Sequence, residues 1–137
     1  MLYVIAYFSA LLVFFLSDMA WLGTMVSRLY RPILGSLLLP GVNLPPAFVF
    51  YLLYPVGVLI FAIAPGLRAG SIGIAILLGA LFGLFTYGTY DLTNQATLRS
   101  WSTALSLADM AWGSVLGAIT AGGATWMATI IGRQIAN

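Results

Sequence analysis

Long apolar runs with almost no charge make up most of this chain. Of its 137 residues, 62% are hydrophobic and 6% are charged, and the mean hydropathy is +1.07. A soluble domain carries about 25% charged residues, so these charges are too few to cover a water-exposed surface. Inside lipid, only helices and closed barrels satisfy their backbone hydrogen bonds, and apolar runs of about 20 residues are typical of spanning helices. The sequence therefore predicts an all-α integral membrane protein.

We expect residues 1–137 to form a single transmembrane domain, a four-helix bundle with both termini on the same side. The predicted spans are 2–26, 47–64, 71–91 and 103–130. The first run lacks a basic n-region and is longer than the apolar core of a signal peptide, so we interpret it as an uncleaved helix. Pro55 predicts a kink in the second span.

The connections between the spans differ in length. Proline and glycine punctuate the long stretch 30–46, and its apolar part, 33–39, is too short to span and is expected in the interface. Residues 65–70 predict a tight turn.

The five arginines give a weak signal for orientation. The side that carries the long connection holds three of them, against two and a free amine on the other side, so we assign it to the cytoplasm. The first group is Arg28, Arg31 and Arg99, and the second is Arg68 and Arg133.

The residues that are absent limit the chemistry. Without cysteine or histidine there is no thiolate nucleophile, imidazole base, Cys-ligated metal or imidazole-ligated haem. We expect no metal, no cofactor and no catalytic residues. The net charge of +2 is too small to suggest nucleic acid as a partner. Any catalysis would have to rest on carboxylates.

The tetrapeptide Asp-Met-Ala-Trp occurs twice, at 18–21 and at 109–112, inside the first and fourth predicted spans. These copies hold two of the three acidic residues, Asp18 and Asp109, and the third, Asp91, closes the third span. The span directions and the rise of about 1.5 Å per residue place all three acids in one half of the bundle, towards the long connection. Because an intramembrane carboxylate is costly, this placement indicates a purpose.

The two copies are expected to match in depth if the first and fourth spans lie side by side. Asp18 would then be level with Trp112, and Asp109 with Trp21. An indole N–H is a donor only and suits a carboxylate acceptor, so two reciprocal hydrogen bonds would form a structural clasp. The same residues fit a ligand or ion site, and a four-residue match also arises by coincidence. The sequence leaves these three interpretations open.

A polar run, Tyr90-Asp91-Leu92-Thr93-Asn94, begins at the end of the third span. It either caps a helix or completes a polar pocket with Asp18 and Asp109. The candidate ligand- or ion-binding residues are therefore Asp18, Asp91, Asp109, Trp21, Trp112, Tyr90 and Asn94.

Two pairs of glycines, each four residues apart, predict close packing of the third and fourth spans, because small residues let two backbones approach in lipid. The pairs are Gly79 with Gly83 and Gly113 with Gly117.

These motifs together resemble a family of small bacterial membrane proteins classed as a domain of unknown function. The resembling motifs are Asp18-x-x-Trp21, Tyr90-Asp91-Leu92-Thr93-Asn94 and Asp109-x-x-Trp112-Gly113. The resemblance covers nearly the whole chain and implies four helices, and hence a multi-pass protein, in a bacterial inner membrane. It implies no activity. The chain departs from the family in having no lysine.

Three functions stay open. The first is a non-catalytic binding protein or accessory subunit, with its Asp/Trp/Tyr cluster near one membrane face. Its partners would be the lipid bilayer, further copies of itself or a larger membrane complex, and a small amphiphile, quinone or carotenoid. The second is a small proton- or cation-coupled transporter that acts as an oligomer. The third is an intramembrane carboxylate-based enzyme. We rank it last, because Ser106-Leu107-Ala108-Asp109 lacks the Gly-x-Gly-Asp context of intramembrane aspartyl proteases.

Overall fold

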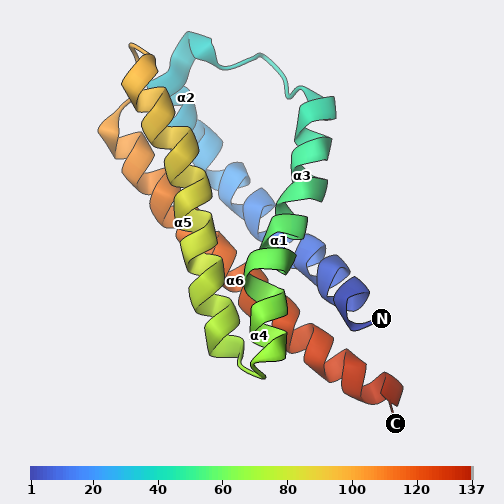
Figure 1. Ribbon diagram of the computed structural model, residues 1–137. Helices are drawn as coiled ribbons and strands as arrows, with labels where there is room; N and C mark the ends of the chain where they lie inside the picture. The colour runs from blue at the N-terminus through green and yellow to red at the C-terminus, as the bar shows by residue number, and fades with distance from the viewer. Residues whose placement is uncertain (137) are drawn as a thin grey trace.

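The computed structural model describes residues 1–136, and this part of the chain is a bundle of helices without a β-strand (Figure 1). Four helical segments within it are long and apolar enough to cross a membrane: Leu2–Leu37, Leu44–Arg68, Ile72–Thr97 and Thr103–Ile135. The predicted all-α membrane bundle is confirmed. Each segment extends beyond the span that the sequence predicts.

The first segment continues well past its predicted end at residue 26. Helix α1 (Leu2–Met25) runs into a π-helical turn, η1 (Val26–Tyr30), and then into α2 (Arg31–Leu34) and the 3₁₀ turn η2 (Gly35–Leu37). Arginines do not stop this helix, because Arg28 and Arg31 lie on its exposed surface. The extra residue of a π turn rotates the residues that follow it, and such turns are frequent at functional sites.

The second segment contains four prolines without being broken: Pro45, Pro46, Pro55 and Pro65. Helix α3 (Leu44–Val58) begins with Pro45 and Pro46 in its first turn, where the missing N–H costs nothing. It passes through Pro55 into a second π-helical turn, η3 (Leu59–Ile63), and then α4 (Ala64–Arg68). The predicted turn at 65–70 is thus shorter than expected. The chain reverses just after Arg68, where Gly70 adopts a left-handed φ of 59°.

Helices α5 (Ile72–Thr97) and α6 (Thr103–Ala136) form the tightest contact in the bundle. The Ser71 side chain caps α5 by accepting the N–H of Ile74 at 3.3 Å. The helix continues past Asp91 to Thr97, so Asp91 lies inside α5 and does not cap its end.

The four glycines allow the α5–α6 contact. A Cβ on Gly79 or Gly83 would overlap the backbone carbonyl of Gly117 or Gly113 respectively. Across the same contact, Ser114 donates a hydrogen bond to the Ala80 carbonyl at 3.1 Å. Helices α5 and α6, which contain the third and fourth predicted spans, thus approach each other closely at these glycines.

The remaining helices close around this pair. Helix α1 lies along α6, with small buried residues such as Ala10 and Ala124 between them. Helix α3 joins through aromatic stacking of Phe14 on Tyr54, at 4.6 Å between ring centroids. Figure 1 shows α3 diverging from α5 towards its N-terminal end, where the connection after η2 crosses the gap. This divergence makes room for the main cavity.

Candidate functional site

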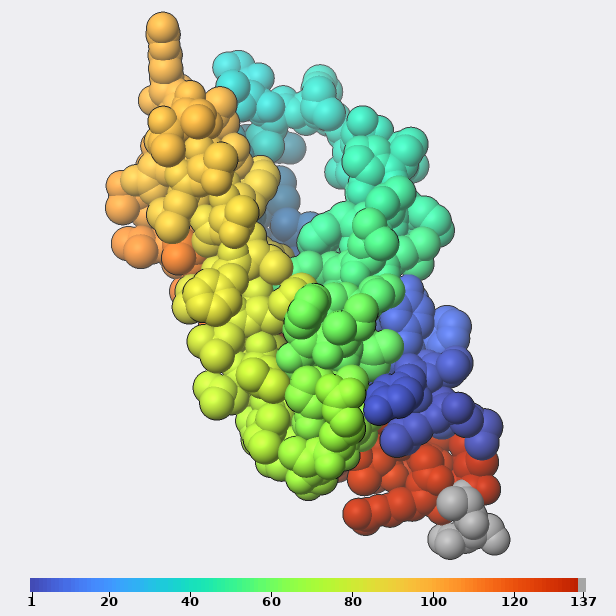
Figure 2. All heavy atoms as spheres, viewed as in Figure 1, coloured from blue at the N-terminus to red at the C-terminus, as the bar shows by residue number. Residues whose placement is uncertain are grey.

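A cavity of about 1030 Å³ lies between the N-terminal half of α3 and helices α1, α5 and α6. Figure 2 shows the hollow between the segment around residues 30–50 and α5, with α1 visible at its back. The long connection and the start of α3 close one wall with apolar residues such as Val42 and Phe48. The polar and aromatic wall consists of Asp18, Trp21, Tyr30, Tyr51, Tyr87, Tyr90, Asp109 and Trp112.

The three acids gather at this end of the bundle, where the span directions predict them. Asp18 and Asp109 line the cavity, and the carboxyl group of Asp91 is adjacent to that of Asp109. All three are buried, with exposed fractions of 5% for Asp18, 4% for Asp109 and 0% for Asp91. No group of three acidic side chains within residues 1–136 is close enough to hold a metal ion.

Tyrosine hydroxyls hold the two carboxylates of the cavity. Tyr51, on α3, donates to Asp18 on α1, and Tyr30, at the end of the π turn η1, donates to Asp109 on α6. A carboxylate has about four acceptor sites, so one donor each leaves most of their acceptor capacity open. The wall includes no arginine, and the sequence has no lysine. The two acids therefore face the cavity without a cationic side chain.

The two tryptophans of the repeat meet each other. Their rings stack at 4.4 Å with an angle of 4° between the planes. The Trp21 indole donates to the Tyr30 hydroxyl at 3.0 Å, and Tyr30 in turn donates to Asp109. The Trp112 indole lies near Asp18 but outside hydrogen-bond geometry, and its buried N–H has no partner within residues 1–136.

The expected direct indole–carboxylate bonds are therefore not formed. Each indole does lie near the acid of the other copy. Trp21 is linked to Asp109 through the Tyr30 hydroxyl, and Trp112 lies near Asp18 without a hydrogen bond. The physical reason is the register of α1 against α6. It stacks the two tryptophan rings on each other, with the Trp21 N–H directed to Tyr30 and the Trp112 N–H outside hydrogen-bond geometry with Asp18.

Asp91 and its neighbours take different positions. Tyr90 lines the cavity and packs edge-on against Trp101, with 5.6 Å between ring centroids. Asn94 does not line the cavity. Neither carboxyl oxygen of Asp91 receives a hydrogen bond from a donor in the described chain. A carboxylate has no hydrogen to donate, so the contact of Asp91 with Asp109 becomes a hydrogen bond only when one of the pair is protonated.

Sequence reasoning missed Tyr30 and Tyr51, the two donors to the acids. Tyr30 falls beyond the predicted end of the first span, and only the π turn brings it back towards α6. Tyr51 lies in a run of aromatic residues on α3 that gives no sign of which ring faces α1. The signal that could have found them is the need of buried carboxylates for hydrogen-bond donors. Tyrosine is the plentiful, largely apolar residue in this chain that carries such a donor.

Within residues 1–136, four long apolar helices around a largely aromatic cavity with two buried aspartates define this chain as a small helical membrane protein. It belongs to the family described as Predicted membrane protein (DUF2177), whose model matches residues 3–126. The match includes both copies of the tetrapeptide and the polar run that begins at the end of the third predicted span. No curated protein and no solved structure shows significant similarity to the chain.

Proposed function

We propose that this protein is a non-catalytic binding protein for an amphiphilic organic cation in a bacterial inner membrane. One observation carries the proposal: Asp18 and Asp109 line one aromatic cavity that has no arginine or lysine on its wall. Buried charges in proteins are normally paired. A cationic ligand supplies the missing partner for these two carboxylates.

The wall around the acids suits an organic cation better than a bare ion. Tyr51, Tyr87, Tyr90 and the two stacked tryptophans present aromatic rings, whose faces attract cations within about 6 Å. The cavity volume, about 1030 Å³, is at the upper end of the range for small-molecule sites. A quinone or carotenoid would fill the volume but, being neutral, would leave both carboxylates unpaired.

The test is equilibrium binding of tetraphenylphosphonium to the purified protein, with triphenylphosphine oxide as the neutral probe. We expect Asp18→Asn and Asp109→Asn each to weaken binding of the cation about ten-fold, because each removes one charge-assisted contact. Asp91→Asn is the matched control, since its carboxyl group does not line the cavity. Equal binding of the cationic and neutral probes would contradict the proposal.

The accessory-subunit alternative makes the opposite prediction. If the acids only clasp helices together, the isolated protein binds no cation above the level of the double variant Asp18→Asn with Asp109→Asn. The exposed α3 side chains Phe48 and Leu53 would then be buried by partner helices of a larger complex or a second copy.

A second candidate, proton-coupled transport by an oligomer, is favoured by the adjacent carboxyl groups of Asp91 and Asp109. Two carboxyls in contact are stable together when they share one proton. A cation that pairs with Asp109 would release that proton. A pH-sensitive dye in weak buffer measures the release. We expect proton release on cation binding in the wild type and not in Asp91→Asn, which still binds the cation. Unchanged proton release in that variant would rule the coupling out.

A further inference from the structure

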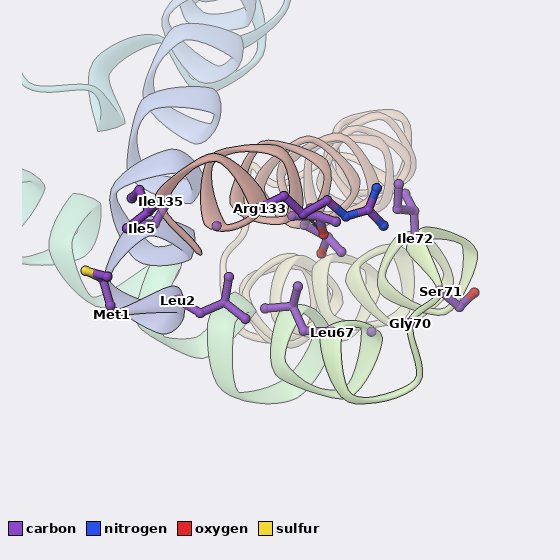
Figure 3. Close-up of a pocket in the computed structure, with 13 residues that line it drawn as sticks. Met1, Leu2, Ile5, Leu67, Gly70, Ser71, Ile72, Arg133 and Ile135 are labelled. Atoms are coloured by element: carbon purple, nitrogen blue, oxygen red, sulfur yellow. Dashed lines mark hydrogen bonds between the residues drawn. The ribbon is translucent and has the colours of Figure 1, made fainter. Parts of the chain in front are cut away.

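A second cavity, of about 610 Å³, lies at the other end of the bundle. Here α1 begins, α6 ends and the chain turns from α4 into α5 (Figure 3). Most of its wall is aliphatic, with Leu2 and Ile5 from α1 and Leu67 from α4. The polar side chains on the wall are Ser71, Thr125, Thr129 and Arg133. Since helices begin and end here, the cavity lies at the level of the lipid headgroups.

The charge at this cavity is positive. Arg133 is the charged side chain on its wall, and none of the three aspartates of the chain lines it. Figure 3 shows the guanidinium reaching from α6 towards Ile72, in the first turn of α5. The first N–H groups of a helix have no intrahelical acceptor, and the helix dipole is positive there. Arg133 and the start of α5 thus present positive charge to the same space.

A buried hydroxyl supplies independent evidence for a ligand. Thr125, Thr129 and Arg133 are four residues apart on α6 and so share one helix face, which lines the cavity. Thr129 donates to the Thr125 carbonyl at 2.8 Å. The Thr125 side chain is 2% exposed, and its hydroxyl has no hydrogen-bond partner within residues 1–136. A buried donor without an acceptor is costly, so this position suits an acceptor from a bound molecule.

We propose that this cavity binds one anionic phospholipid. The Arg133 guanidinium contacts the phosphate, an ester oxygen accepts from the Thr125 hydroxyl deeper on α6, and an acyl chain lies along the aliphatic side chains of the wall. On α6 the cation lies one turn outside Thr129 and two turns outside Thr125, as the phosphate of a phospholipid lies outside its ester groups. The lipid is anionic, because no acid lines the wall to pair with the ammonium group of a zwitterionic headgroup.

The test is lipid retention by the purified protein in native mass spectrometry, with phosphatidylglycerol and phosphatidylcholine of equal chain length. We expect the wild type to retain about ten times more of the anionic lipid, because the ammonium group of phosphatidylcholine would meet the positive charge of Arg133 with no acid on the wall to pair with it. Arg133→Gln should lower this retention to the level of phosphatidylcholine. Arg68→Gln is the matched control, since Arg68 is exposed at the end of α4, at the same end of the bundle, but does not line the cavity.

Two further variants test the proposal. Thr125→Val preserves shape and should weaken retention of both lipids, which gives a second reading if Arg133→Gln fails to fold. Asp18→Asn should leave retention unchanged, so this site and the cation site fail separately. Equal retention of both lipids by the wild type, or equal losses in Arg68→Gln and Arg133→Gln, would overturn the proposal. Displacement of the lipid by inorganic phosphate alone would overturn the choice of a lipid.

Discussion

The two copies of Asp-Met-Ala-Trp have the same residues and different surroundings. In the first copy, Asp18 accepts from Tyr51 and Trp21 donates to Tyr30. In the second, Asp109 accepts from Tyr30 and also touches Asp91, whereas the Trp112 N–H is left without a partner in the described chain. Identical tetrapeptides thus reach different states of hydrogen bonding because different helices face them.

The copies differ most in what lies next to them along the helix. Gly113 follows the second tryptophan directly, and a Cβ there would overlap the ring of Tyr87. Gly23 lies two residues after Trp21, the last residue of the first copy, and a Cβ there would meet nothing within 4 Å. The second copy is therefore followed by the tight α5–α6 contact, and the first by an exposed position on α1. Packing, more than the motif itself, decides which copy tolerates change.

The largest expected effect tests this difference in packing. Gly113→Leu should prevent assembly of the bundle, since the inserted side chain overlaps Tyr87 and costs more than about 3 kcal/mol. Gly23→Leu, the matched substitution, should leave stability unchanged or raise it, because leucine favours helix over glycine by roughly 0.8 kcal/mol. Thermal unfolding in detergent measures both variants. Equal stability of the two would show that the α5–α6 contact is looser than the structure indicates.

An intermediate effect is expected at the two tyrosines. Tyr30→Phe removes the donor to Asp109 and the acceptor for Trp21, so it should lower the free energy of unfolding by about 2 kcal/mol. Tyr51→Phe removes only the donor to Asp18 and should cost about 1 kcal/mol.

The matched control for both tyrosines is Tyr7→Phe. It removes one hydroxyl that donates to a backbone carbonyl of α3, that of Leu52, at 3.1 Å in an exposed position, so it should cost less than either. Denaturant titration gives the three values. A larger loss for Tyr51→Phe than for Tyr30→Phe would contradict the bridging role of Tyr30.

The sequence was sufficient to predict the all-α membrane bundle and the end of the bundle at which the acids gather, because both follow from apolar length and helical rise. It predicted the α5–α6 contact from glycine spacing, since only glycine permits that approach. It did not predict the partners of the acids. Those depend on the π turn before Arg31, which redirects Tyr30, and on the register of α1 against α6, which is set by packing along both helices.

The chain also gave no sequence signal for the second cavity. In the sequence, Arg133 contributes only to the orientation signal of the arginines, and nothing distinguishes Thr125 from the other threonines. Their relation to the start of α5 is a matter of tertiary structure, which brings residues about sixty positions apart to one wall. The ligand-binding roles of the candidate residues in both cavities remain predictions.

The smallest expected effect separates the stacked tryptophans. Trp21→Phe loses part of the stack and the bond to Tyr30, and should cost about 1–2 kcal/mol. Trp112→Phe loses a similar part of the stack but also removes a buried N–H without a partner, so the two changes offset each other and the net loss should stay below about 0.5 kcal/mol. Trp126→Phe, at a position 55% exposed, is the control and should have no effect.

The three unfolding free energies test the asymmetry between the two tryptophans directly. If Trp112→Phe is the more damaging substitution, the Trp112 N–H has a partner, with Asp18 the nearest acceptor, and the second copy is as fully bonded as the first.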